Sequence, residues 1–254
     1  MNFPLEKDTK KIIKLAVLKI TDTVDYYKEY ITTTKKTHEM QEQGHENADS
    51  VDSQVCEILE SSNEDMEFEY NGIKYFVKIV GKNKKRSFGD IYAEIYSKEN
   101  KSLYFRFPIN TKVTFDDEKG QPNLAAFNRI KEHCIKGSFH YFVFIVDCSL
   151  RKENNNAPIS VYCLSVPYLM NKEPLKYITY NAGPGQTMLN KAKIHELRIN
   201  TNENVLFDEN MNFKGFENVL NLYVTKKIKE HIELRTKQMK KLTDQIMEHT
   251  DKFY

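Results

Sequence analysis

Amide side chains gather in the stretch NAGPGQTMLNK at residues 181–191, where Gly183-Pro184-Gly185 restricts the backbone. Asn and Gln hydrogen-bond adenine through two atoms in the major groove of DNA, so amides on a rigid loop suit the reading of A·T pairs. Basic residues beside such a loop suit phosphate contacts. The same composition also fits a plain Gly-Pro turn between two strands, and both interpretations stay open at this point. The amides are Asn181, Gln186 and Asn190, and the lysines are Lys191 and Lys193.

A second unusual stretch is SLYFRFPINTK, residues 102–112, which has the composition of a β-strand. Alternation along a strand places Arg106 and Pro108 on one face together with Tyr104. Because Pro cannot donate a ladder hydrogen bond, Pro108 predicts an edge strand or a bulge. The guanidinium of Arg106 suits either a bidentate contact to phosphate or a structural salt bridge with Asp90.

Charge is distributed in blocks, although the formal net charge is only +2. Residues 37–70 carry eleven Asp or Glu and no Lys or Arg, whereas residues 71–101 carry eight Lys or Arg and three acids. Residues 226–241 carry seven Lys or Arg and two Glu. Basic blocks of this kind attract polyanions such as nucleic acid, although lysine-rich helix faces are as often simply solvated.

Several function classes lack their sequence signatures. The chain has neither of the Gly-rich loops that bind nucleoside triphosphates and dinucleotides, and its histidines and four cysteines do not have metal-binding or redox spacings. The N-terminal residues have no signal-peptide pattern, and no segment is apolar and uncharged over the length that a membrane span needs. The sequence therefore predicts a cytoplasmic protein with no membrane partner.

The elements predicted to position these residues form one domain over residues 1–254, with an α/β fold in which helices flank a mixed sheet. An N-terminal helix is predicted within residues 1–36. Asn71-Gly72 is a strong hairpin signal between two runs of strand composition. A terminal basic helix is predicted at 216–252, where Met239, Leu242, Ile246 and Phe253 recur at nearly 3.5-residue spacing. Further helices are predicted at 50–62 and 122–137, and strands at 66–70, 73–80, 89–98, 102–112, 139–148, 159–166 and 175–180.

This order of elements resembles the core of the PD-(D/E)xK nucleases, and three segments resemble type II restriction endonucleases with AT-rich recognition sites. They are NLAAFNRIKEHCIKGSFHYFVFIVD at 123–147, YITYNAGPGQTMLN at 177–190, and FENVLNLYVTKKIKEHIELRTKQMKKL at 216–242. The resemblance implies a restriction endonuclease-like core whose catalytic strands and recognition loop lie within residues 51–190. Since near-palindromic sites are read by two-fold dimers, it also implies a homodimer.

In that family a metal-binding Asp begins one strand, and the next strand carries D-x-K or E-x-K. Asp90, in GDIYAEI, takes the first position and is the expected Mg²⁺ ligand. The positions expected to hold the acid and the lysine are occupied by Arg106 and Pro108. An Arg cannot ligate a cation, and a Pro has no side-chain proton to move.

Three arrangements would restore the missing groups. A shifted register makes Lys112 the catalytic lysine. The acid comes from the following helix, where Glu132 is the candidate. Alternatively Glu94, on the strand and face of the first ligand, is the second metal ligand, with Lys98 further along. The resemblance also gives Glu57 the role of the acidic residue on the first core helix.

The sequence thus predicts a restriction endonuclease-like protein that recognises specific double-stranded DNA, with Mg²⁺-dependent phosphodiester cleavage if its atypical site is intact. The alternative is the same fold without activity, kept as a DNA-binding or protein-interaction module. A third hypothesis is a structural protein that oligomerises through its long terminal helices. The predicted catalytic residues are Asp90, Glu94, Lys112 and Glu57, with Asp90 and Glu94 as metal ligands, and the predicted DNA contacts are Arg106, Asn181, Gln186, Asn190, Lys191 and Lys193.

Overall fold

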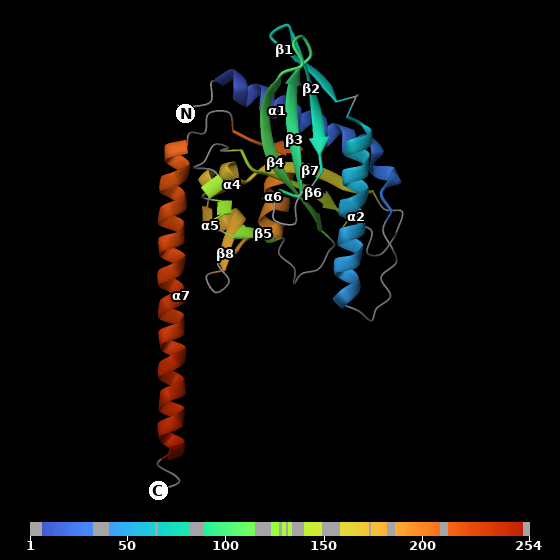
Figure 1. The fold of residues 1–254 in the computed structure, drawn as a ribbon. Helices are drawn as coiled ribbons and strands as arrows, with labels where there is room; N and C mark the ends of the chain where they lie inside the picture. The colour runs from blue at the N-terminus through green and yellow to red at the C-terminus, as the bar shows by residue number, and fades with distance from the viewer. Residues whose placement is uncertain are drawn as a thin grey trace.

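A computed structural model gives the fold of the chain (Figure 1). It describes residues 7–32, 41–63, 66–81, 89–114, 123–126, 129–130, 132–133, 140–148, 158–172, 174–181, 186–208 and 213–250. Within these ranges, no helix combines the length and the apolar character needed to span a bilayer.

A seven-stranded mixed sheet forms the centre of the molecule, with the strand order β1-β2-β3-β4-β6-β7-β10. β1 to β4 form an antiparallel meander, whereas β4 pairs with β6 and β7 pairs with β10 in parallel. β6 and β7 are antiparallel. The strands are β1 (Glu67–Tyr70), β2 (Ile73–Val80), β3 (Ile91–Ser97), β4 (Leu103–Thr114), β6 (Phe142–Asp147), β7 (Ser160–Ser165) and β10 (Val205–Leu206).

Two helices cover one face of this sheet. α1 (Lys7–Tyr27) buries an apolar stripe that includes Ile13, Val17 and Ile20, and η1 (Lys28–Tyr30) continues it. α2 (Gln41–Ser61) packs against β2 and β4, and against α1. Together with the inward side chains of the strands these helices form the larger of two apolar clusters.

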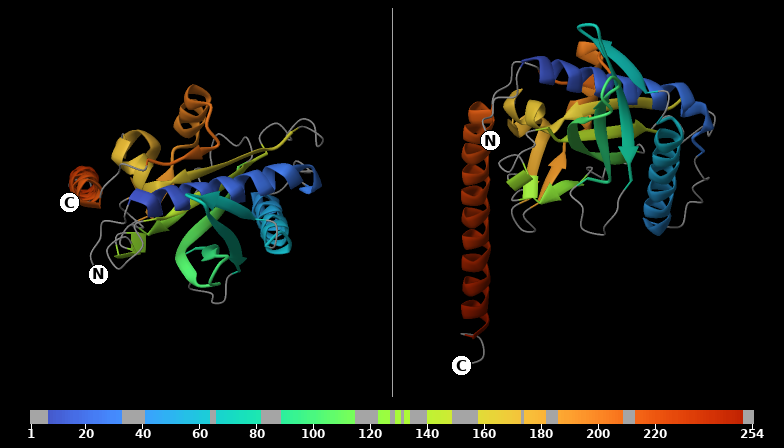
Figure 2. Two further views of the ribbon diagram at one scale, coloured as in Figure 1. Left: turned by 90° about the horizontal axis from the view of Figure 1, so that it is seen from above. Right: turned by 45° about the horizontal axis from the view of Figure 1, so that its top comes forward.

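Among the described residues, the opposite face carries a smaller three-stranded sheet, with the order β5-β9-β8, and the helices α4 to α7. Its apolar cluster includes Val143, Ile145 and Tyr162 from the large sheet and Leu189 and Ile194 from the covering layer. Figure 2 shows the two layers from above and from a tilted view. The elements are β5 (Asn123–Ala126), β8 (Ile178–Asn181), β9 (Gln186–Leu189), α4 (Val166–Lys172), α5 (Pro174–Tyr177), α6 (Lys191–Thr201) and α7 (Phe213–Thr250).

The predicted class, a mixed α/β fold with helices around one large sheet, is confirmed. The Asn71-Gly72 hairpin is also confirmed, because both residues have positive φ and join β1 to β2. The predicted helix at 122–137 is wrong at its start, since Asn123–Ala126 is strand β5 and pairs with β9. Tertiary pairing overrides the helical pattern there. α6 and β10 were not predicted.

The strand that contains Pro108 is not at an edge, because β4 lies between β3 and β6. Pro108 is tolerated since β4 pairs with β6 only from Ile109 onward. A bulge does occur, but at Tyr104: Ile95 pairs with Phe105, and the next pair skips to Leu103. The bulge turns Tyr104 towards α1, where its hydroxyl lies 2.9 Å from Thr9 Oγ1. Tyr104 therefore does not share the face of Arg106.

Candidate functional site

Asp90 and Lys112 lie together where β3 begins and β4 ends. Asp90 Oδ2 is 3.5 Å from Lys112 Nζ and accepts a hydrogen bond of 3.1 Å from the backbone N–H of Thr111. Both side chains are partly open to solvent. The pair therefore consists of a carboxylate held in place by the backbone and an ammonium group that can still reach a ligand.

The local backbone explains why Asp90 takes this position. Its N–H donates to two oxygen atoms of β4, the carbonyl oxygen of Ile109 at 3.0 Å and Oδ1 of Asn110 at 3.2 Å. Gly89 permits this close approach, because a Cβ there would come within 2.8 Å of both the carbonyl oxygen of Ile91 and Cβ of Pro108. The Gly-Asp dipeptide and Pro108 are thus parts of one packed corner.

Asn110 is a residue of this site that the sequence analysis did not identify. Extending the pairing of Ile91 with Ile109 by one residue places Asn110 directly across from Asp90. The amide is buried, and its Nδ2 donates to the carbonyl oxygen of Leu124 at 3.2 Å and to the hydroxyl of Tyr141 at 2.6 Å. The spacing Asn110-Thr111-Lys112 was the available signal, since it has the form of D-x-K with an amide in place of the acid.

Glu94 and Arg106 form a second charged pair on the same two strands. They face each other across β3 and β4, with 3.4 Å between Arg106 Nε and Glu94 Oε1. The guanidinium also lies over the Tyr92 ring, 4.4 Å from its centroid, and Glu94 Oε2 accepts a 2.7 Å hydrogen bond from Tyr96. Arg106 is thus paired with Glu94 and not, as one interpretation expected, with Asp90.

Glu94 is not brought together with Asp90 as a second metal ligand. The two residues are four apart on an extended backbone, which separates their Cα atoms by about 13 Å. The Glu94 carboxylate is also engaged by Arg106 and Tyr96. Alternation did place both acids on one face, but the distance along the strand keeps them apart.

Glu57 is exposed on α2, the helix that packs against β2 and β4. Its neighbour Cys56 is half-buried, and burial raises the pKa of that thiol to about 11, with further contributions from nearby negative charges. These charges include both Glu57 and Asp90. The other two acids that act on Cys56 are Asp52 and Glu60.

The donors on β3 and β4 do not fit a magnesium site with two carboxylates. Asp90 offers one carboxylate, and the facing position holds Asn110, whose amide already makes three hydrogen bonds. In the part of the chain that the structure describes, no three His, Cys, Asp or Glu side chains are placed to hold one metal ion. A second carboxylate for a cation beside Asp90 must therefore come from outside these two strands.

The predicted recognition segment forms the β8–β9 hairpin and the start of α6. Asn181 pairs with Gln186 at the turn end of the hairpin, and Gln186 is half-buried. Residues 182–185, which include the Gly-Pro-Gly turn, lie outside the described residues. The hairpin thus places residues 181 and 186 at the same end.

The remaining predicted DNA contacts have local roles at the start of α6. Asn190 is the N-cap of this helix, and its side-chain oxygen accepts from the N–H of Lys193 at 3.4 Å. Lys193 Nζ pairs with Glu196 at 2.7 Å. Lys191 is half-exposed at the first helical position. The Asn190 amide is therefore occupied in capping, whereas the lysines lie at the surface.

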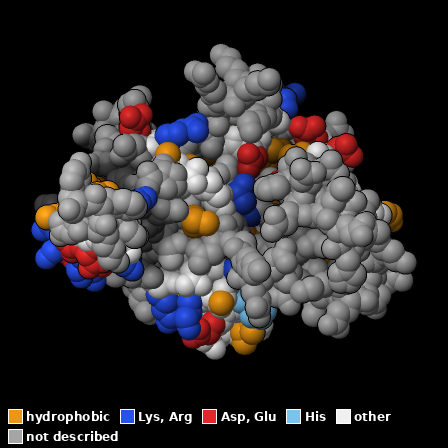
Figure 3. Space-filling view, turned by 90° about the horizontal axis from the view of Figure 1, so that it is seen from below, with side chains coloured by type: hydrophobic (Ala, Val, Ile, Leu, Met, Phe, Trp, Pro, Cys, Tyr) orange, Lys and Arg blue, Asp and Glu red, His pale blue; other side chains and the backbone are white. Residues whose placement is uncertain are grey.

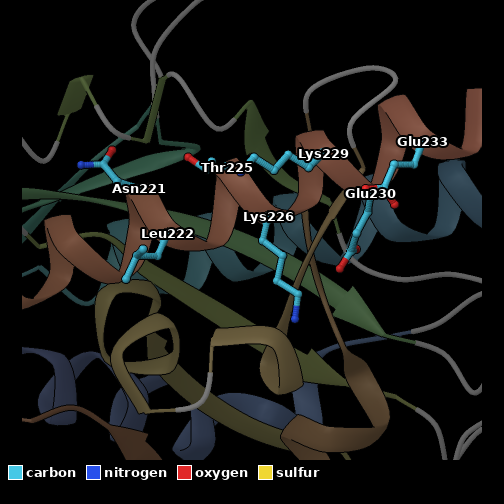
Figure 4. Close-up of a pocket in the computed structure, with 7 residues that line it drawn as sticks. All are labelled: Asn221, Leu222, Thr225, Lys226, Lys229, Glu230 and Glu233. Atoms are coloured by element: carbon cyan, nitrogen blue, oxygen red, sulfur yellow. The ribbon is translucent and has the colours of Figure 1, made fainter. Parts of the chain in front are cut away.

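α7 runs past the body of the protein, packs against α4, α5 and β8, and continues well beyond them (Figure 1). A hollow of about 520 Å³ lies along its first half, and Figure 4 shows Leu222, Lys226 and Glu230 pointing to the same side of the helix. Two lysines and two glutamates line this hollow, so their charges balance and do not favour an anion. Its described lining consists of Asn221, Leu222, Thr225, Lys226, Lys229, Glu230 and Glu233.

Three of these features face the same side of the molecule. β2 points downward in Figure 1, so antiparallel β3 begins and β4 ends on the lower side, where Asp90 and Lys112 lie. The β8–β9 hairpin lies low beside α7, whose far half projects below the body. Figure 3 views this side directly, with Lys and Arg side chains near its centre and at the left edge, where α7 is seen end-on.

No protein-family model matches the chain, and no curated protein matches it.

Proposed function

We propose that the chain is a restriction endonuclease-like protein that binds double-stranded DNA with Asp90 and Lys112 facing a backbone phosphate. The observation that carries the proposal is the 3.5 Å contact between these two side chains, with Asn110 two residues before Lys112. This is the family's arrangement of an Asp followed by an x-K strand, with an amide at the acid position. The shifted register that the sequence analysis considered gives the same lysine.

The topology around the pair supports the proposal. α2 precedes an antiparallel meander of β2, β3 and β4, and residues 129–130 and 132–133 are helical before β6 pairs with β4 in parallel. The family core that the sequence resembles has the same order of helix, hairpin strands, helix and buried strand. This order of elements supports the proposal.

In this proposal the protein's own residues bind and position the DNA. Lys112 donates to a phosphate oxygen, and Asp90 fixes the ammonium group by its charge while it is itself held by the N–H of Thr111. Lys191 contributes a further phosphate contact, and Asn181 and Gln186 contact base edges from the end of the hairpin. Asn110 lends no charge, so Asp90 is the single carboxylate that the two strands place at this point.

Mg²⁺-dependent cleavage is the second candidate function. It is favoured by one observation, that α2, which carries Glu57, packs against β4, whose Thr111 N–H holds Asp90. A divalent cation beside Asp90 supplies Lewis-acid chemistry to phosphodiester cleavage when it is bound. Glu132, exposed on the helical turn that follows β5, is the other acid considered for this role.

The two functions are separated by incubating the purified protein with a long, sequence-diverse DNA in Mg²⁺ and in Mn²⁺. We expect the protein to shift the DNA on a gel without cutting it, because β3 and β4 place only one carboxylate, that of Asp90, at this site. Discrete fragments would establish the second function, and the Glu57→Gln and Glu132→Gln variants would then identify the additional acid. A protein that neither shifts nor cuts duplex DNA at low salt refutes both.

A further inference from the structure

α7 carries a row of exposed apolar side chains along the half that projects beyond the body. Ile228, Ile232, Met239, Leu242 and Ile246 are between 42% and 71% exposed in the single chain. Ile232 to Ile246 alone spans about 21 Å of helix. A helix that leaves so much apolar surface in water has an unsatisfied packing face.

The spacing of this row is that of a coiled coil. With Arg235 included, the positions from Ile228 to Ile246 advance by alternating steps of four and three residues. This is the a/d repeat that keeps one face of a helix turned towards a second helix. In the heptad, Ile232, Met239 and Ile246 take position a, while Ile228, Arg235 and Leu242 take position d.

The residues that flank the row are almost all uncharged. Positions e and g, which lie beside the partner helix in a coiled coil, are Lys229, His231, Thr236, Gln238, Thr243 and Gln245. Most of the lysines of the basic block take the outer positions b, c and f, namely Lys226, Lys227, Lys237, Lys240 and Lys241. Two copies of this helix therefore meet with few like charges at the flanking positions, in spite of the basic block.

We infer that α7 pairs with α7 of a second copy of this chain in an antiparallel coiled coil centred near Lys237. In this register Ile228 packs on Ile246 of the second copy, and Ile232 packs on Leu242 of the second copy. Arg235 meets Met239, whose flexible apolar side chain accommodates the stem of the arginine. The row is thus complementary to itself only when one helix is reversed.

Arg235 decides the orientation, because no flanking ion pair does. In a parallel pair the two Arg235 side chains occupy the same layer and repel each other. In the antiparallel register they are displaced by four residues, about 6 Å along the axis. A single charged residue in an apolar seam is a recognised means of fixing register. This inference does not depend on DNA binding, so it stands or falls separately from the proposed function.

The mass in solution tests the inference, with a matched pair of variants on one helix. Leu242 and Leu234 are 60% and 54% exposed, but Leu234 lies at outer position c, away from the row. We expect the unchanged chain and Leu234→Glu to sediment as dimers, and Leu242→Glu to sediment as a monomer with unchanged helical circular dichroism. A monomeric unchanged chain overturns the inference, and so does a Leu242→Glu dimer or equal dissociation of both variants.

The orientation is tested by the distance between spin labels on a Glu248→Cys variant, with the labelled unsubstituted chain as the background from native thiols. In the antiparallel register the two labelled positions are offset by about 33 Å along the helix axis. In a parallel pair they lie side by side. A short distance between labels contradicts the antiparallel arrangement.

Discussion

Asp90 and Lys112 come from different strands, 22 positions apart in the sequence, yet their charged atoms lie 3.5 Å apart. Asp90 is held by backbone N–H donation from Thr111, so the carboxylate has a fixed direction and the lysine is drawn to it. The facing position on β4 is Asn110, whose amide is buried and fully engaged. This combination, a carboxylate and an ammonium group beside a buried amide, is the basis of the predictions below.

Lys112→Ala should weaken the binding of all duplex DNA, because it removes one phosphate contact. The slope of log affinity against log salt concentration should become shallower by about 1. Fluorescence anisotropy with a labelled duplex measures both quantities. Lys98→Ala is the control, since Lys98 pairs with Glu67 just beyond the opposite end of β3. Equal effects of the two substitutions would remove Lys112 from the interface.

Asn110→Asp should create a divalent-cation site that the natural chain lacks on these strands. Side chains directly across two antiparallel strands have Cβ atoms about 5 Å apart, which lets two carboxylates share one ion. Without metal the variant should be less stable, because two carboxylates then face each other and the bonds to Leu124 and Tyr141 are lost.

The melting temperature measured with and without Mn²⁺ checks this prediction. The cation should raise the melting temperature of Asn110→Asp by several degrees at concentrations well above its dissociation constant, and that of the natural chain much less. The double variant Asp90→Asn with Asn110→Asp keeps a single carboxylate and serves as the control. A response in the double variant equal to that of Asn110→Asp would mean that the ion binds elsewhere.

Gln186→Ala should reduce sequence preference more than it reduces overall affinity. A bidentate amide contact to a base contributes about 1–3 kcal/mol of discrimination, whereas phosphate contacts contribute to all sequences alike. Sequencing the duplexes retained from a random pool measures the preference. Lys191→Ala is the matched comparison and should weaken every duplex equally. If both substitutions cause the same loss on selected and random DNA, Gln186 has no role in readout.

His140 should make the fold less stable in mild acid. It is fully buried among Phe105, Phe142 and Phe207, and burial lowers its pKa from 6.5 to about 3, with smaller contributions from Lys10 and His133. Because the unfolded chain takes up this proton near pH 6.5 and the folded chain does not, stability is complete above that pH. It falls as the pH decreases from 6.5 towards 3.

Chemical denaturation at pH 8 and pH 5 checks the effect of His140, which should lower the free energy of unfolding by about 2 kcal/mol between these values. His140→Phe should remove most of this difference. His195→Gln, which alters an exposed histidine on α6, should leave it in place. An unchanged pH dependence in His140→Phe would show that other groups cause it.

The sequence predicted the class of the fold because its signals are local. Asn71-Gly72 specifies a hairpin by its own backbone preferences, and the apolar run that becomes β6 is buried on both faces. Register is less local. The bulge at Tyr104 and the extension of β4 to Thr114 depend on pairing with β3 and β6, so alternation alone did not show that Lys112 lies beside Asp90.

The site was predicted in part for the same reason. Asp90 follows from the Gly-Asp start of a strand, but its partner depends on which residue of β4 lies opposite, and that is set by the corner of Gly89 and Pro108. The pairing of Arg106 with Glu94 also follows from this register. The strand β5 and the capping role of Asn190 depend on contacts between distant segments, which periodicity does not contain.

The most direct test of the account is the binding of the unchanged protein to a labelled duplex in EDTA, measured by anisotropy over a series of salt concentrations. We predict binding at low salt that weakens steeply and linearly on logarithmic axes, because it depends on several phosphate contacts. Absence of binding at the lowest salt concentration, from protein whose circular dichroism shows the mixed α/β fold, would contradict the proposed function.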